Sequence, residues 1–166
     1  MHESRKDIRL TLCSDGRDGG TIDECQFNIP NIMQLGTNAK DVYLTVERLH
    51  VESSLTDNDE TFVLMLDSHP ISGQYDSILK RSGNIIALLG NNQAAGVYRS
   101  HAGLALENIP VSNFLGSQIR LRLTTMKTKS NVADYYPPIV VNSDGADTTV
   151  IRKWYAVLKL AFCECQ

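Results

Sequence analysis

The sequence predicts an all-β protein, an antiparallel β-sandwich with about eight strands in a single domain spanning residues 1–166. Three observations predict this class. Apolar and polar residues alternate with a period of two in several short segments, turn-forming residues separate those segments, and no long amphipathic helical pattern is present. One core is sufficient, because a chain of this length buries roughly 70% of the surface that its unfolded form exposes.

The first half of the chain contains four strand patterns. The first three alternate, and the fourth is nearly continuously apolar, as in a strand covered on both faces of its sheet. The Ser14–Gly20 sequence favours a reversal of the chain after the first pattern, and Pro30 ends the second. The predicted strands are 8–13, 22–29, 40–52 and 61–67.

The second half contains candidate strands with less regular spacing. The segment 74–81 is predicted to form a short helix or an irregular excursion, and Pro110–Gly116 a loop or a brief helical turn. A long polar loop, 127–147, precedes the last strand. The predicted strands are 84–89, 97–100, 103–109, 118–125 and 149–162.

The last predicted strand, 149–162, has the clearest two-faced pattern. Its apolar face predicts a position deep in the sheet, and it consists of Trp154, Ala156, Leu158, Leu160 and Phe162. The opposite face is mixed, with Tyr155, Val157, Lys159 and Ala161. We expect this second face to meet solvent or a neighbouring subunit, which makes Tyr155, Val157 and Lys159 candidate interface residues.

The connections between the predicted strands differ widely in length. Uneven connections favour a Greek-key or jelly-roll topology over a simple meander. No internal repeat recurs at a fixed period, which argues against a propeller or a solenoid. The predicted fold is therefore a single jelly roll of about eight strands.

Composition limits the functions that fit this chain. The net charge is −3, and acidic residues concentrate in the first half, which favours either ordinary solvated charge or complementary surfaces in an oligomer. The charged N-terminus lacks an apolar signal core, and no apolar run approaches the roughly 18 residues that span a bilayer. We expect neither secretion nor membrane insertion. The 4 cysteines are accordingly expected to be free thiols.

No motif in the sequence predicts a reaction. The histidines are isolated, without the pair two residues apart that a metal-dependent cupin would need. Cys163 and Cys165 could join Cys13 or Cys25 in a thiolate site, although zinc sites normally place two residues between paired cysteines. No nucleophile elbow or phosphate-binding loop is present. The sequence therefore predicts no catalytic, metal or cofactor site, and leaves open a site assembled only in three dimensions.

Basic residues gather on the strand 118–125 and the turn after it. The patch consists of Arg120, Arg122, Lys127 and Lys129. Nucleic-acid contact is one interpretation. The absence of interleaved aromatic residues and the acidic isoelectric point near 5.8 favour a solvated face or a subunit contact instead.

Two segments carry a resemblance to a known family. They are Glu107–Gly116 leading into Gln-Ile-Arg-Leu-Arg-Leu, and the terminal sequence from Trp154 to Phe162. In these segments and in its architecture, the chain resembles the single jelly-roll capsid proteins of eukaryotic DNA viruses. These are the minor or penton-type subunits that accompany a double jelly-roll major capsid protein.

The resemblance implies a structural role without catalytic residues. Copies of the chain would associate into a homo-oligomer, with a pentamer favoured and a trimer possible, and would contact other capsid proteins. The location implied is the virion, after synthesis in the cytoplasm or nucleus of a host cell.

Two other classes of function fit a β-sandwich of this size. A binding module, either carbohydrate-binding or a trimeric ligand of the tumour-necrosis-factor type, is the first alternative. Sugar recognition favours exposed aromatic residues, for which Tyr135 and Tyr136 are candidates. A cupin-like enzyme is the second, and it lacks the histidine pair.

Overall fold

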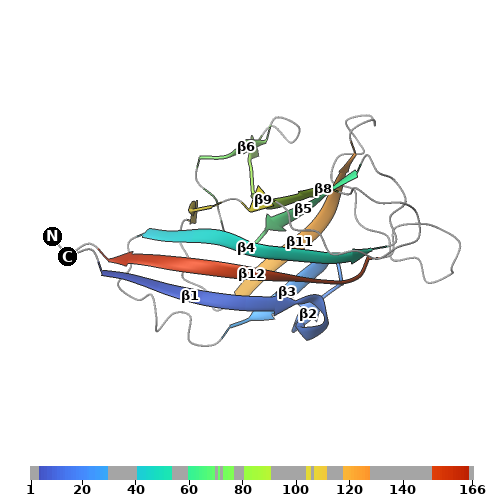
Figure 1. Cartoon of the computed structure of the whole chain (residues 1–166), viewed down its shortest axis with the longest axis horizontal. Coiled ribbons are helices and arrows are strands. Elements are labelled where there is room, and N and C mark those ends of the chain that lie inside the picture. The colour runs from blue at the N-terminus through green and yellow to red at the C-terminus, as the bar shows by residue number, and fades with distance from the viewer. Residues whose placement is uncertain are drawn as a thin grey trace, which may run out of the picture.

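The computed structural model confirms an all-β sandwich of two stacked antiparallel sheets (Figure 1). It describes residues 4–29, 41–53, 60–69, 71, 73–76, 81–90, 104–105, 107–111, 118–127 and 151–164. A short 3-10 helix, η1 (Ser14–Gly16), follows the first strand. Among these described residues, no helix is long and apolar enough to cross a membrane.

Each sheet has one long strand pair at its centre. Sheet A has the order β1-β12-β4-β10, and these strands are Ser4–Cys13, Ile151–Glu164, Asp41–Ser53 and Ile109–Val111. Sheet B has the order β2-β3-β11-β5-β8-β9, and these strands are Gly19–Gly20, Glu24–Asn28, Gln118–Lys127, Glu60–Leu66, Ile85–Gly90 and Leu104–Ala105. A separate pair consists of β6 (Tyr75–Asp76) and β7 (Arg81–Ser82).

The strand order is that of a jelly roll. Within the described ranges, each sheet has four strands longer than two residues. They are β1, β12, β4 and β10 in sheet A, and β3, β11, β5 and β8 in sheet B. Along the chain, successive strands cross between the sheets except from β5 to β8, which are neighbours in sheet B. The first strand pairs along its whole length with the last, from Ser4 with Glu164 to Cys13 with Tyr155. This crossing pattern with adjacent terminal strands is the jelly-roll arrangement.

Strand β12 lies at the centre of sheet A, as its sequence pattern predicts. The side chains of its apolar face are buried in the common core, and they are Trp154, Ala156, Leu158, Leu160 and Phe162. Its other face differs from expectation at one position, because Ala161 is 1% exposed. Ala161 pairs with Asp7 of β1 and Tyr43 of β4, so its small side chain lies between two longer neighbours.

A β-bulge in β4 changes which residues face the core. Val157 of β12 pairs with Arg48, whereas the next residue, Leu158, pairs with Val46, so Glu47 is the extra residue. Both Glu47 and Arg48 are exposed as a result. The buried positions of β4 accordingly shift from even numbers before the bulge to odd numbers after it.

Sheet B is covered on both faces around β5. Residues 62–66 are all buried, which confirms the prediction from their continuous apolar sequence. Thr124 of β11 is also buried, and it pairs with Val63. The outer face of sheet B is therefore covered over its middle, whereas Arg120 near the start of β11 is exposed.

Three predicted segments differ from the structure. The segment 74–81 has no helix in its described part and contributes β6 and β7 instead. The predicted strand 103–109 divides into β9 and the start of β10, and Pro110 lies inside β10 instead of in a loop. An edge strand tolerates this proline because one side of its backbone needs no ladder partner. The predicted strand 97–100 and residues 128–147 of the predicted long loop lie outside the described residues.

Candidate functional site

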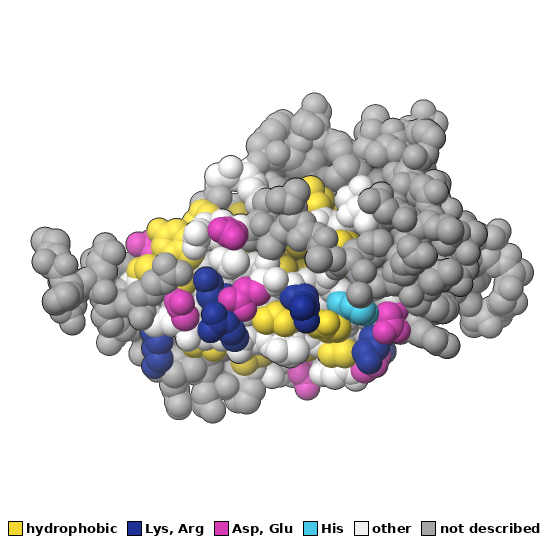
Figure 2. Space-filling model, viewed as in Figure 1, with side chains coloured by type: hydrophobic (Ala, Val, Ile, Leu, Met, Phe, Trp, Pro, Cys, Tyr) yellow, Lys and Arg dark blue, Asp and Glu magenta, His cyan; other side chains and the backbone are white. Residues whose placement is uncertain are grey.

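The candidate interface lies along the middle of the outer face of sheet A. Tyr155, Val157 and Lys159 all point away from the core, and all three are partly exposed. Acidic, basic and hydrophobic side chains alternate over this face (Figure 2). The predicted residues therefore form one continuous stripe flanked by both β1 and β4.

Tyr155 stacks on a histidine from the neighbouring strand. Its ring lies parallel to that of His50, with centroids 4.9 Å apart and an interplanar angle of 13°. The same imidazole places Nε2 3.6 Å from Oε1 of Glu52. Because each ring covers one face of the other, this pair offers less open aromatic surface than two separate rings would.

An ion pair spans β12 next to this stripe. Arg9 on β1 donates from Nε to both carboxylate oxygens of Glu47 on β4, at 3.1 and 3.0 Å. The hydrogen bond and the charge of Glu47 raise the pKa of the Arg9 guanidinium. The β4 bulge makes this contact possible because it turns Glu47 to the outer face.

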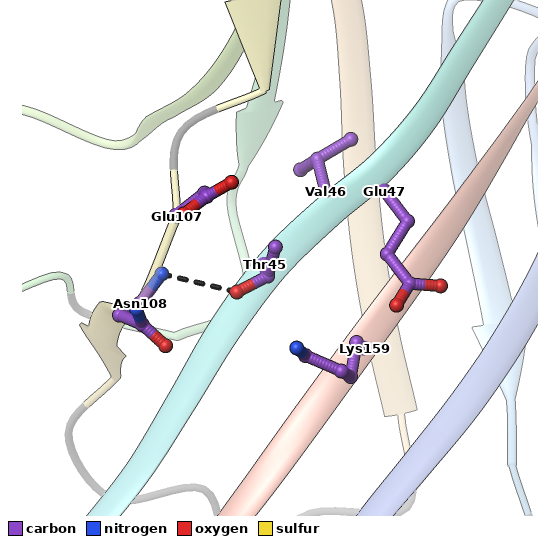
Figure 3. Close-up of a pocket in the computed structure, with 6 residues that line it drawn as sticks. All are labelled: Thr45, Val46, Glu47, Glu107, Asn108 and Lys159. Carbon is purple, nitrogen blue, oxygen red and sulfur yellow. Dashed lines mark hydrogen bonds between the residues drawn. The ribbon is translucent and has the colours of Figure 1, made fainter.

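A shallow pocket of about 300 Å³ opens beside Lys159, and its lining residues are Thr45, Val46, Glu47, Glu107, Asn108 and Lys159 (Figure 3). The backbone N–H of Asn108 donates to the Thr45 hydroxyl at 3.0 Å. Asn108 has a φ of 51°, a left-handed conformation that asparagine tolerates better than most residues. This turn places Glu107 at the rim of the pocket, immediately before β10 begins.

The pocket presents one cation and one anion without an ion-pair partner in the described part of the chain. The Lys159 amine extends toward Thr45, whereas the Glu47 carboxylate lies over β12 (Figure 3). Glu47 is paired with Arg9. Among the described residues, Glu107 and Lys159 are the lining charges without an ion pair. The arrangement suits a ligand or a protein surface that carries both signs of charge.

The predicted basic patch is divided by the structure. Arg122 is held by Asp67, with Nε 2.9 Å from Oδ2 and Nη2 donating to Oδ1 at 3.3 Å. The Nε atom is buried. It lies within ion-pair distance of Asp67 Oδ2 but makes no hydrogen bond. Arg120 is exposed on the same face of β11.

The lysines of the patch lie farther along the chain. The backbone of Lys127 pairs with Glu60, seven residues beyond Arg120, or about 23 Å along the strand. Lys129 lies outside the described residues. Of the two arginines of this patch, Arg120 is exposed and Arg122 is held by Asp67.

The described cysteines are free thiols, as predicted. Cys13 and Cys163 lie at opposite ends of the β1–β12 pair, so a thiolate site that combines them is ruled out. Cys25 is completely buried in the core, and burial raises the pKa of its thiol to about 12. Among the described side chains, no group of three or more His, Cys, Asp or Glu residues could hold a metal ion.

Sequence reasoning missed the pocket. It identified Lys159 but not Thr45, Glu107 or Asn108. Thr45 and Asn108 are in contact although they lie 63 positions apart in the sequence. One signal was present. The core periodicity of β4 slips between Val46 and Leu49, which indicates a bulge and therefore an outward-facing Glu47.

These features define the class of the protein as a single jelly-roll β-sandwich with a mixed apolar and charged face on sheet A. Comparisons of the chain with known protein families, curated proteins and solved structures found no match.

Proposed function

We propose that this chain is a structural capsid subunit of the minor or penton type, which assembles with copies of itself into a five-fold ring and contacts other capsid proteins in a virion. The observation that carries the proposal is the outer face of sheet A. Its centre holds partly exposed Tyr155 and Val157 between charged residues, a composition typical of subunit contacts.

The topology supports the same proposal. The jelly-roll order of the strands is the architecture that the sequence resemblance implies. Viral capsid domains are among the proteins that use this architecture. Because folds host many functions, the proposal rests on the sheet A face together with the fold, and not on the fold alone.

The alternatives find less support in the described residues. A sugar-binding platform needs an open aromatic face, whereas Tyr155 uses one ring face against His50. Tyr135 and Tyr136 lie outside the described residues. A cupin site would require several ligands around one ion, whereas His50 lies on the outer face of sheet A and no group of three or more His, Cys, Asp or Glu residues that could hold a metal ion is found in the described part of the chain. A ligand of the tumour-necrosis-factor type would form a trimer, whereas the proposed capsid subunit forms a five-fold ring. Light scattering distinguishes the two by the mass of the complex.

A charge placed in the stripe tests the proposal. Substitution Val157→Asp puts a carboxylate in the centre of the sheet A face, and size-exclusion chromatography with light scattering then measures assembly. We expect the wild-type chain to form a closed ring and the variant to lose it, because an unpaired charge is costly to bury at an interface. Val157→Thr is the matched control, since it keeps the branched shape without a charge.

Thermal unfolding of each variant distinguishes lost assembly from lost folding. A folded Val157→Asp chain that assembles as the wild type does would remove this face from the contact. A wild-type chain that remains a monomer and binds glycans would contradict the proposed function.

A further inference from the structure

Resting on the proposed function, we infer that the pocket on sheet A receives Arg120 of the next copy of this chain, so that the ring forms by contact between sheet A of one copy and sheet B of its neighbour. Lys159 and Glu107 line the receiving surface. Arg120 with Glu24 forms the entering surface, since both are exposed.

The two surfaces lie on opposite sides of the sandwich. β12 and β4 belong to the near layer in Figure 1, and β11 and β3 to the far layer. One copy therefore cannot satisfy its own charges across this distance. A contact between two different surfaces of identical chains is heterologous, and it generates a ring when the rotation closes.

Some charges around both surfaces are already paired within the chain. Arg9 holds Glu47 beside the pocket, and Asp67 holds Arg122 beside Arg120. In the described part of the chain, Glu107 and Lys159 at the pocket and Arg120 and Glu24 on sheet B have no ion pair. Arg48, also exposed and without an ion pair there, lies outside the pocket lining, opposite Val157. The pocket and the sheet B surface thus each present one cation and one anion, which allows Arg120 to meet Glu107 and Glu24 to meet Lys159.

The backbone around Arg120 is held in place. Its N–H donates to the Ser68 hydroxyl at 3.0 Å, and its carbonyl oxygen accepts from the N–H of Asp67 at 2.9 Å. Glu24 lies on the neighbouring strand directly opposite Arg122, and therefore diagonally across from Arg120, which pairs with Gln26. Arg120 and Glu24 thus project from the same face of two paired strands.

The pocket has room for a guanidinium group beside a carboxylate. Its volume is about 300 Å³, and exposed Glu107 is one of its lining residues. Arginine binds carboxylates through two parallel N–H bonds, which gives geometric specificity. A contact of sheet B with itself would instead place Arg120 near a second Arg120, and like charges in opposition are unfavourable.

Charge reversal and its repair test the inference. Arg120→Glu and Glu107→Arg each place like charges at the contact, whereas the double variant restores opposite charges in swapped positions. We expect each single variant to lower the association constant of the full chain about tenfold or more, and the double variant to recover most of that loss. Lys6→Glu is the control, because Lys6 is exposed on β1 and belongs to neither surface.

The outcomes separate this inference from the proposed function. A wild-type chain that does not assemble contradicts both. A wild-type chain that assembles, with single reversals no weaker than Lys6→Glu or with no recovery in the double variant, overturns the Arg120 contact and leaves the structural role standing. Arg120→Gln provides a second test, since neutralisation should weaken assembly less than reversal does.

Discussion

Trp154 ties the two sheets together through Ile22. The indole N–H of Trp154, on the central strand of sheet A, donates to the carbonyl oxygen of Ile22 at 2.5 Å, just before β3 of sheet B. Its ring also meets Phe27 edge to face, with centroids 6.4 Å apart. Its backbone N–H donates to the buried Ser14 hydroxyl at 3.1 Å. One residue thus joins the core, the first turn and both sheets.

Replacing this tryptophan should destabilise the fold. Trp154→Phe leaves a cavity and removes the donor to the Ile22 carbonyl, so we expect a loss of about 2 kcal/mol in the free energy of unfolding. Urea denaturation followed by circular dichroism measures it. Tyr43→Phe, on the outer face of β4, is the control and should change stability by less than about 0.5 kcal/mol. Equal losses in the two variants would contradict the role assigned to Trp154.

The left-handed turn at the pocket makes a second prediction. Asn108→Val forces a β-branched residue into a φ of 51° and should cost about 1–2 kcal/mol in unfolding free energy. Asn108→Gly, which adopts this conformation without strain, should leave stability within about 0.5 kcal/mol of wild type. Chemical denaturation of the pair measures the difference. A valine variant as stable as the glycine variant would show that this turn is not strained.

The buried thiol of Cys25 predicts a dependence on alkaline pH. Its folded pKa of about 12 lies above the ordinary value of 9.0, because burial disfavours the thiolate. The unfolded chain therefore loses this proton first, and the stability gained from the neutral thiol declines as pH rises from 9 toward 12. Unfolding free energies of wild type and Cys25→Ala across this range should converge as pH rises. Parallel curves would contradict the assignment.

His69 predicts a dependence on acidic pH. Burial lowers the pKa of its imidazole below the ordinary 6.5, so the folded chain keeps this ring neutral where the unfolded chain binds a proton. Its contribution is present above pH 6.5 and is lost as pH falls below that value. His69→Gln should flatten the stability curve between pH 7 and 5. Denaturation at several pH values measures this, and a variant with the same slope as the wild type would contradict it.

The sequence pattern was sufficient for the architecture but not for the site. The alternation from Trp154 to Phe162 correctly placed the last strand at the centre of a sheet, because its period matches the pleat of a strand with one face in the core. Pro110 misled the same reasoning, since a proline ends most strands but is accepted at an edge.

The pocket depended on pairing that no local pattern contains. The register of β12 with β4 brings Lys159 opposite Thr45, and the separate turn at Asn108 adds Glu107. Long-range pairing is set by the whole sandwich, so a reading of local periodicity could find Lys159 without its neighbours. The pairing of Arg122 was missed for a related reason, because its contact with Asp67 joins residues 55 positions apart.

Native mass spectrometry of the purified chain of residues 1–166 tests the proposed structural role directly. A structural subunit that associates through the outer face of sheet A should form a closed complex of five copies, which Val157→Asp disperses and Val157→Thr retains. A chain that stays monomeric at every concentration tested would contradict this role.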